Sequence, residues 1–294
     1  MIRRRRCPAL VCVVLLASFA VAQSSAPATV VVTVPVADMY SSATTDADVV
    51  SQAIYGSNLL VLEQKPEWAK VQTSDHYAGW VSADKVRRAD NSAGYATSGR
   101  TAQVSSLSAN LYRETDVTAH RPMITVAFET RLEVVSEGAG DAAGWYQVRL
   151  PDQQLAWIQQ GDVELERKPL SIEQSIELAK RFLGVTYTWG GRSSFGFDCS
   201  GFTQMLVRSR GINMPRDADQ QAAWDGALPV ERKKLRPGDL LFFGSSANHI
   251  THTGMFIGGG KFIHDTTYEH PGVQISRLKD QPWTKLLVAC RRIK

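Results

Sequence analysis

An internal repeat occupies the first half of the chain and limits its possible folds more than any other feature. The matched positions, all 77 residues apart, are Trp68 with Trp145, Val71 with Val148, Trp80-Val81 with Trp157-Ile158, and Val86 with Val163. Upstream, Met39-Tyr40 matches Leu111-Tyr112 at an offset of 72, so the second copy carries about five extra residues, which we place between Glu137 and Gly144. Short β-branched runs broken by turn residues predict that each copy is a small all-β module.

The remainder of the chain has a different pattern. Ser171 and Gln174 form a capping box before apolar residues at helical spacing, and Gly184 is placed to end that helix. Later runs, including residues 185–191, predict strands, and a helical start followed by strands is typical of an α+β domain. We therefore expect a multidomain chain with two small all-β domains at residues 30–90 and 100–166, joined by 91–99, and an α+β domain at 170–294.

The N-terminus carries a predicted signal peptide over residues 1–22. A positive segment, Arg3–Arg6, precedes an apolar run from Ala9 to Ala22, which ends in Ala20-Val21-Ala22. The run is 14 residues long, whereas a helix that spans a bilayer needs about 20. We expect a secreted or periplasmic protein with no integral membrane segment after cleavage; the alternative is a retained membrane anchor.

The charge balance changes once the signal is removed. The chain has 33 basic and 29 acidic side chains, and residues 1–22 hold four arginines and no acids, so 33 − 4 leaves 29 of each. A net charge of zero with no clustered basic face does not favour nucleic-acid binding.

Cys199 is the candidate nucleophile. Asp198 is a suitable N-cap for the helix that follows, which would place Cys199 in the first turn, where the helix dipole favours a thiolate. The other cysteine that follows the signal, Cys290, lies in an apolar run that predicts a buried strand. We expect two free thiols; a Cys199–Cys290 disulfide is the alternative.

Two histidines are placed to serve this thiol. His252 and His264 lie on predicted strands joined by the turn Gly258–Gly260, so His264 is expected to bond the far nitrogen of His252. A base held in one tautomer can then take the proton of Cys199.

Other uses of the histidines are less well supported. His249 and His270 are expected in loops, as bystanders. Zinc bound by Cys199, His252, His264 and Asp265 is the metal alternative, but no spacing typical of zinc sites supports it, so we expect no metal and no cofactor.

Four segments of the third domain occur in a characteristic order: Asp198-Cys199-Ser200-Gly201-Phe202, Arg236–Phe243, His252–Gly258 and Phe262-Ile263-His264. Together they resemble the successive motifs of the NlpC/p60 family, which consists of papain-like cysteine peptidases that act on peptidoglycan peptides. The resemblance implies that Cys199 is the nucleophile, His252 the base and His264 the third polar residue. Thr253 stands where the family usually has valine.

Each repeat also resembles a bacterial SH3-like (SH3b) barrel, since it ends in a Gly-Trp-Val or Ala-Trp-Ile strand, although the usual Asn-Val-Arg opening is absent. The repeat tryptophans are expected in the barrel cores. A signal, two SH3b modules and an NlpC/p60 domain together resemble the γ-D-glutamyl-L-diamino-acid endopeptidases. The family resemblance implies five substrate-binding side chains: Tyr77, Trp189, Asp198, Ser200 and Asp217.

Some of these residues have specific expected roles. Tyr77, in a Tyr-x-Gly-Trp motif, is replaced by Gln154 in the second repeat and is implied to enclose the free N-terminal L-Ala of the substrate. Asp198 is implied to meet the substrate amine. Asp217 lies in a Pro-Arg-Asp segment in which Ala218 replaces a serine often found next.

The expected function is that of a monomeric, secreted cysteine endopeptidase. It would hydrolyse the bond between γ-D-Glu and an L-diamino acid, diaminopimelate, in peptidoglycan stem peptides (muropeptides) with a free L-Ala. One alternative is an SH3b cell-wall-binding protein with weak or no catalysis. Another is an N-acetylmuramoyl amidase or acyltransferase on the same scaffold.

Overall fold

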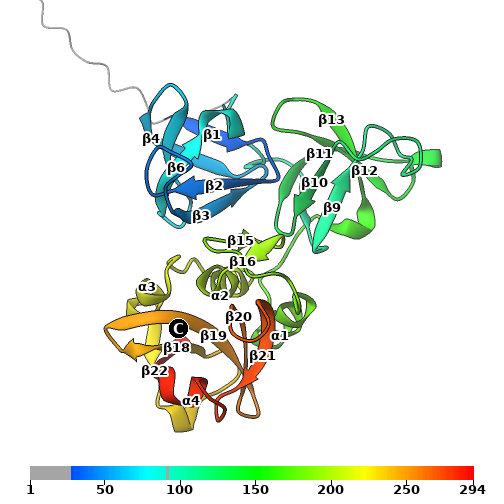
Figure 1. Ribbon diagram of the computed structural model, residues 1–294. Coiled ribbons are helices and arrows are strands. Elements are labelled where there is room, and N and C mark those ends of the chain that lie inside the picture. Colours follow the sequence, from blue (N-terminus) through cyan, green and yellow to red (C-terminus); the bar gives the residue numbers. More distant parts are fainter. Residues whose placement is uncertain (1–27, 91–92) are drawn as a thin grey trace, which may run out of the picture.

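The computed structural model describes residues 28–90 and 93–294, so the predicted signal peptide lies outside the described residues. Two β-domains lie side by side, and the α+β domain lies against both of them (Figure 1). This arrangement confirms the fold class expected from the repeat and from the change of pattern near residue 170.

The first domain is one strongly bent sheet with the strand order β3-β2-β6-β5-β4-β1-β7. Its strands are β1 (Thr29–Val32), β2 (Val36–Tyr40), β3 (Val49–Ile54), β4 (Asn58–Gln64), β5 (Trp68–Gln72), β6 (Ala78–Ser82) and β7 (Val86–Arg88), with a 3-10 turn, η1 (Ala83–Lys85). Alternate residues face inward, so Val32, Met39, Val71 and Val81 form a fully buried core.

The second domain repeats this plan. Its elements are β8 (Thr101–Val104), β9 (Ser108–Leu111), β10 (Ile124–Ala127), β11 (Arg131–Glu137), η2 (Gly140–Ala142), β12 (Trp145–Arg149), β13 (Leu155–Gln159), η3 (Gln160–Asp162) and β14 (Val163–Glu164). The strands form a five-stranded sheet, β13-β12-β11-β8-β14, and a separate pair, β10-β9. Leu111, Leu132, Val148 and Ile158 are fully buried at its centre.

The structure also reproduces the offsets of the repeat. β4 and β11 begin 73 residues apart (131 − 58), whereas β5 and β12 begin 77 apart (145 − 68), so four of the extra residues lie in the turn that contains η2. A tyrosine meets a tryptophan edge-on in both copies, Tyr40 with Trp68 at 5.5 Å and Tyr112 with Trp145 at 5.6 Å between ring centroids. Trp80 and Trp145 are buried as expected, whereas Trp68 and Trp157 are only partly buried.

In the described part of the joining segment, residues 93–99, only residues 94–96 are buried. Tyr95 is buried, its backbone N–H donates to the side chain of Asn58 at 2.7 Å, and its hydroxyl donates to the carbonyl of Arg149 at 2.5 Å. One side chain thus fixes the first barrel against the second.

The third domain places helices on one six-stranded sheet of order β17-β22-β18-β19-β20-β21. Its elements are α1 (Ile172–Arg181), β15 (Arg192–Ser193), β16 (Gly196–Phe197), α2 (Cys199–Arg208), α3 (Ala218–Ala223), β17 (Ala227–Pro229), η4 (Arg232–Lys234), β18 (Leu240–Ser246), β19 (His249–Gly258), β20 (Lys261–Thr266), β21 (Gly272–Arg277), α4 (Trp283–Leu286) and β22 (Leu287–Ile293). Phe182, Phe202, Leu206 and Phe242 fill the core beneath α2.

Most local predictions in this domain are confirmed. The Ser171–Gln174 capping box, the Asp198 cap and the glycine hairpin between β19 and β20 all form. The strand predicted at 185–191 is wrong, because there the chain makes only an isolated bridge, Tyr187 to Phe197, before turning. The loop position predicted for His249 is also wrong, because this exposed residue begins β19.

The face of α2 that lies away from the sheet contacts both β-domains (Figure 1). Arg208, at the end of α2, donates to Glu129 of the second domain at 3.1 Å and 2.6 Å. Phe128 packs edge-on against Phe182 at 5.3 Å and so joins the core of the third domain. The barrels therefore pack tightly on the third domain.

Glu129 has an unfavourable backbone conformation that serves this contact. Its φ is 70°, in the left-handed region that favours glycine, and the matching position of the first repeat, 73 residues earlier, is Gly56 with φ 75°. The second copy keeps the turn but replaces glycine with a carboxylate. We infer that the ion pair with Arg208 offsets the backbone strain.

Glu129→Ala and Glu129→Gly separate the contribution of the ion pair from that of the backbone strain. Both variants remove the carboxylate, but only glycine also relieves the strain at a positive φ. Loss of hydrogen bonds to a charged partner should reduce the free energy of unfolding by roughly 1.5–3 kcal/mol in both variants. Glycine should recover about 1 kcal/mol relative to alanine, since it adopts a positive φ without steric cost. Urea unfolding of the three proteins measures this; a glycine variant no more stable than the alanine variant would rule out the strain.

Candidate active site

The candidate nucleophile lies at the first position of α2. The Asp198 side chain caps this helix, because its Oδ1 accepts a hydrogen bond from the backbone N–H of Gly201 at 2.7 Å. Cys199 follows at once and is 8% exposed, with the free backbone N–H groups of the first turn around it. The Cys199–Cys290 disulfide alternative is wrong, since both cysteines are free and buried.

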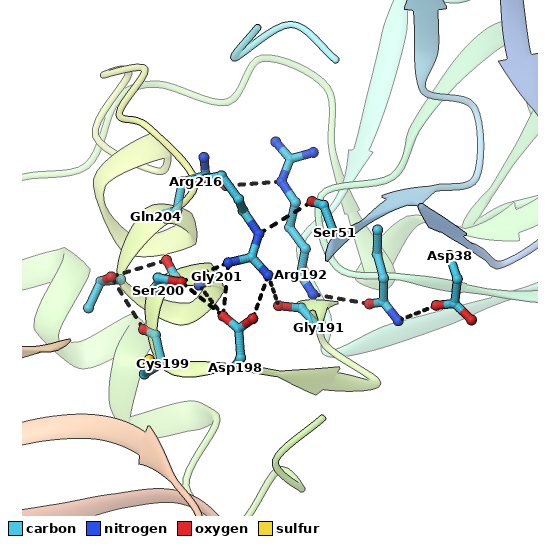
Figure 2. Close-up of polar contacts among 12 residues, drawn as sticks. Asp38, Ser51, Gly191, Arg192, Asp198, Cys199, Ser200, Gly201, Gln204 and Arg216 are labelled. Carbon is cyan, nitrogen blue, oxygen red and sulfur yellow. Dashed lines mark hydrogen bonds and ion pairs between the residues drawn. The ribbon is translucent and has the colours of Figure 1, made fainter. Parts of the chain in front are cut away.

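Arg216 holds this cap in place (Figure 2). Its guanidinium, 1% exposed, pairs with both carboxylate oxygens of Asp198, Nη1 to Oδ1 at 2.9 Å and Nη2 to Oδ2 at 2.6 Å. It also donates to the Ser200 hydroxyl at 2.7 Å and to the carbonyl of Gly191 at 3.2 Å. A two-point arginine–carboxylate pair is strong and directional, so it fixes the start of α2.

The first β-domain takes part in the same network. Arg216 Nε lies 3.3 Å from the hydroxyl of Ser51 on β3, as Figure 2 shows. Beside it, Gln204 of α2 donates to Asp75 at 2.7 Å and accepts from Arg192 Nε at 3.0 Å. The start and middle of α2 are therefore attached to the first barrel by buried polar contacts.

The two predicted histidines meet as expected. His252 Nε2 on β19 lies 2.8 Å from His264 Nδ1 on β20, and His264 Nε2 lies 2.9 Å from the Ser276 hydroxyl on β21. The Cys199 thiol contacts the backbone N–H of Thr253, the residue after His252, so the thiol lies beside the strand that carries this imidazole. The other ring nitrogen of His252, Nδ1, takes no part in these contacts with His264 and Ser276.

Burial determines the resting protonation of this pair. Burial, with the Asp198 carboxylate second, raises the pKa of the Cys199 thiol to about 12. Burial also lowers the pKa of His252 to about 4, against the opposing effect of Asp198. Without substrate, the structure favours a neutral thiol and a neutral imidazole. This differs from the resting thiolate expected from the helix dipole, because desolvation outweighs it.

A residue of the first barrel reaches the site. The Tyr77 hydroxyl hydrogen-bonds the Asp217 carboxylate; burial, followed by the charge of Asp217, raises the pKa of Tyr77 to about 12. Burial also raises the pKa of Asp217, although Arg216 opposes this. The structure thus brings Tyr77, Asp217, Asp198 and Ser200 to the surroundings of one guanidinium.

The other predicted substrate-binding residues differ in how free their side chains are to contact a substrate. The oxygens of Asp198 are engaged by the helix cap and Arg216, and the Ser200 hydroxyl by Arg216 and Asp198. Trp189 is 70% exposed, so its indole is free to act as an apolar wall but is not part of the packed site.

Asp265 is a buried carboxyl that sequence reasoning considered only as a metal ligand. β19 and β20 pair Met255 with Ile263, so two residues further on Thr253 stands opposite Asp265. Both are fully buried, and neither the Thr253 hydroxyl nor either Asp265 oxygen has a well-formed hydrogen bond within the described ranges. Burial, with Asp198 second, raises the pKa of Asp265 to about 8.

Two further residues were missed at the sequence level. Arg216 was noted only as part of a motif, and its neighbours Pro215 and Asp217 carry no signal that it would be buried against Asp198. Tyr187 was assigned to a strand; its hydroxyl lies near Cys199, Asp198 and Asp265, and burial, followed by those acidic neighbours, raises its pKa.

Neither a metal site nor a membrane helix occurs in the part of the chain that the structure describes. No group of three or more His, Cys, Asp or Glu side chains there is arranged to hold a metal ion. No helix there is long and apolar enough to cross a membrane.

Known proteins match the chain over all three domains. Residues 184–292 match the NlpC/P60 family, residues 39–86 a bacterial dipeptidyl-peptidase SH3 domain, and residues 104–165 a YKFC SH3b2 domain. A γ-D-glutamyl-L-lysine dipeptidyl-peptidase from Bacillus cereus (strain ATCC 10987 / NRS 248) is 30% identical over 257 residues, covering 82% of this chain and 74% of that protein. A protein of the same name from Bacillus subtilis (strain 168) is 28% identical and covers 84% of this chain and 82% of its own length.

A solved structure agrees with the fold. The crystal structure of an NlpC/P60 family protein from Bacillus cereus ATCC 10987 superposes with a TM-score of 0.76 at 25% identity, over 90% of this chain and 99% of that one. The fold and the site define a class of protein in which two SH3-like barrels are packed on an α+β domain that has cysteine and histidine at one site. The chain belongs to the NlpC/P60 family of peptidases.

Asp265→Asn tests the buried carboxyl through the pH dependence of stability. The pKa of Asp265 is about 8 in the folded protein and near 3.8 when unfolded, so between these values the folded state binds more protons and stability falls as pH rises. His252, with its folded pKa lowered to about 4, affects stability mainly below pH 6.5.

Between pH 6.5 and 8, the pH dependence of stability that Asp265 causes is therefore separated from the pH dependence that His252 causes. There the free energy of unfolding of the native chain should fall relative to Asp265→Asn by up to about 1.4 kcal/mol per pH unit. Urea unfolding at three pH values gives both slopes; parallel slopes for the two proteins would show that Asp265 is already ionised.

Proposed function

We propose that this protein is a cysteine peptidase that hydrolyses the bond between γ-D-Glu and the L-diamino acid in peptidoglycan stem peptides with a free N-terminal L-Ala. The observation that carries the proposal is the thiol of Cys199 at a helix start, beside the strand of a histidine that is oriented by His264. The names of the relatives, which specify γ-D-glutamyl-L-lysine, support the bond class. The choice of diaminopimelate rests on the family resemblance.

The proposed reaction has two stages. In the first, Nδ1 of His252 takes the proton of Cys199, and the thiolate attacks the carbonyl carbon of γ-D-Glu. The C–N bond then breaks, the imidazolium gives its proton to the leaving amine, and a thioester remains. In the second, His252 takes a proton from water and the resulting hydroxide attacks the thioester carbonyl. The C–S bond then breaks, the imidazolium returns its proton to the sulfur of Cys199, and the acid is released.

The start of α2 would stabilise the oxyanion of each tetrahedral intermediate. The backbone N–H of Cys199 has no partner within its helix, because it is the first helical residue. Removal of one such donor costs roughly 3–4 kcal/mol in other enzymes. The Asp198–Arg216 pair contributes indirectly by holding the direction of the helix.

Proton transfer from thiol to imidazole must occur against the effect of burial on both groups. The pKa of Cys199 is raised to about 12 and that of His252 is lowered to about 4, so the ion pair is unfavourable in the empty site. Transfer concerted with attack avoids a free ion pair, because negative charge passes at once to the carbonyl oxygen. The thiol is therefore activated only when a substrate is bound.

The charges near Arg216 favour a substrate ammonium. Two carboxylates, Asp198 and Asp217, surround one guanidinium, which leaves one excess negative charge within reach of Tyr77. An ammonium would balance that charge, whereas an acylated amine would leave the half-buried Asp217 carboxylate without a cation. Asp217 is the better candidate for direct contact, because its only side-chain partners in the described structure are the Tyr77 hydroxyl and the Gln220 amide, whereas the oxygens of Asp198 are engaged by the helix cap and Arg216. Ala218 supplies no hydroxyl to assist it.

The proposal includes domain limits at 30–90, 100–166 and 170–294, secretion, and a monomeric state. It also assigns the nucleophile to Cys199, the base to His252 and the orienting residue to His264.

Cys199→Ala provides the direct test of the nucleophile, with Cys290→Ala as the matched control. Both variants remove one buried thiol from the same domain, and Cys290 lies on β22 in a separate apolar cluster. Mass spectrometry of L-Ala-γ-D-Glu-diaminopimelate digests should show L-Ala-γ-D-Glu and free diaminopimelate with Cys290→Ala, and at least a 10³-fold lower rate with Cys199→Ala. Retained activity in a folded Cys199→Ala protein would contradict the proposal.

A further inference from the structure

A cavity of about 450 Å³ lies where the three domains meet. It is lined by the same turn from both repeats, residues 55–58 of the first and, 73 positions later than Gly56 and Asn58, Glu129 and Arg131 of the second. The connection at 167–169 and the end of α2 close the remaining sides. None of Cys199, His252 and Tyr77 lines it, so it is separate from the candidate active site.

Basic side chains dominate the lining. They are Arg131, Arg167, Lys168, Arg192 and Arg208, against one acidic side chain, Glu129. Arg208 is paired with Glu129 at 2.6 Å, and Arg192 with Asp75 at 3.5 Å.

Three cations of the lining therefore remain without an acidic partner. Across residues 28–90 and 93–294, Arg131, Arg167 and Lys168 form no salt bridge. Arg131 only donates to the Thr101 hydroxyl at 3.3 Å. A concave site with three uncompensated positive charges attracts anions and holds them more strongly than an exposed patch does.

Arg167 adds an independent sign of an absent partner. Its guanidinium lies over the Phe128 ring, 4.6 Å from the centroid, which fixes its plane. Its Nη1 is buried and has no hydrogen-bond acceptor in the described structure. A buried guanidinium donor without an acceptor is unusual. Arg167 also lines the cavity, and a carboxylate or phosphate oxygen matches the fork geometry of a guanidinium.

We propose that this cavity binds a small anion that carries two or more carboxylate or phosphate groups, held by Arg131, Arg167 and Lys168. The volume lies within the range of small-molecule sites. Two or more anionic groups are required because the three free cations come from different walls: a strand of the second barrel and the connection to the third domain. Such a ligand would bridge two domains and so stabilise their packing.

Calorimetric titration of the native chain with inorganic pyrophosphate and with citrate, at constant ionic strength, tests the site. We expect one saturable site for at least one probe; tighter binding of pyrophosphate assigns the site to phosphates, and tighter binding of citrate assigns it to carboxylates. The double variant Arg131→Gln/Lys168→Gln removes two exposed cations and should weaken binding at least tenfold. Arg167→Gln, which removes the unpaired donor, should weaken it as much.

The matched control is Lys261→Gln/Lys279→Gln, which changes the net charge equally at exposed positions of the third domain that lie outside this cavity. It should bind as the native chain does. Binding that is absent for both probes, or weakened equally by the control pair, would overturn the site. Cys199→Ala should retain full binding, so failure of the proposed peptidase activity and failure of this site are distinguishable.

Discussion

The buried ion pair between Asp198 and Arg216 is the interaction on which the rest of the site depends. Charges this deeply buried are tolerated only when they are paired and hydrogen-bonded, and here every contact has a structural consequence. Asp198 caps the helix that begins with Cys199, while Arg216 reaches the Gly191 turn and Ser51 of the first barrel. Loss of either partner would leave the other buried and unpaired, which typically costs 3–5 kcal/mol.

Because this pair reaches into the first barrel, the site belongs to two domains. Tyr77 of that barrel hydrogen-bonds Asp217, and Asp75 accepts a hydrogen bond from Gln204 on α2. The second barrel contributes differently, through Glu129 and through Phe128, which enters the core of the third domain. The repeated modules therefore contribute side chains to the surroundings of the candidate site and fix the domain arrangement, and the same packing creates the basic cavity between them.

Sequence patterns were sufficient for features that depend on local or periodic signals. The tryptophan offsets predicted two copies of one barrel, the cap predicted the place of Cys199, and the glycine hairpin predicted that His264 would meet His252. Features that depend on burial could not be predicted. The pairing of Arg216 with Asp198 joins residues 18 positions apart through a loop, and nothing local shows which charges become desolvated. The raised pKa values of Cys199 and Asp265 have the same origin.

The most direct test of a site built around one guanidinium and two carboxylates is the ratio of kcat/KM for two peptides. They are L-Ala-γ-D-Glu-diaminopimelate and its N-acetylated form, measured with the native chain and with Tyr77→Phe. An unbalanced buried charge predicts at least about a 100-fold preference for the free amine in the native chain. Tyr77→Phe should reduce that preference mainly by raising KM for the free peptide. Equal kcat/KM values for the two peptides in the native chain would contradict recognition of the amine.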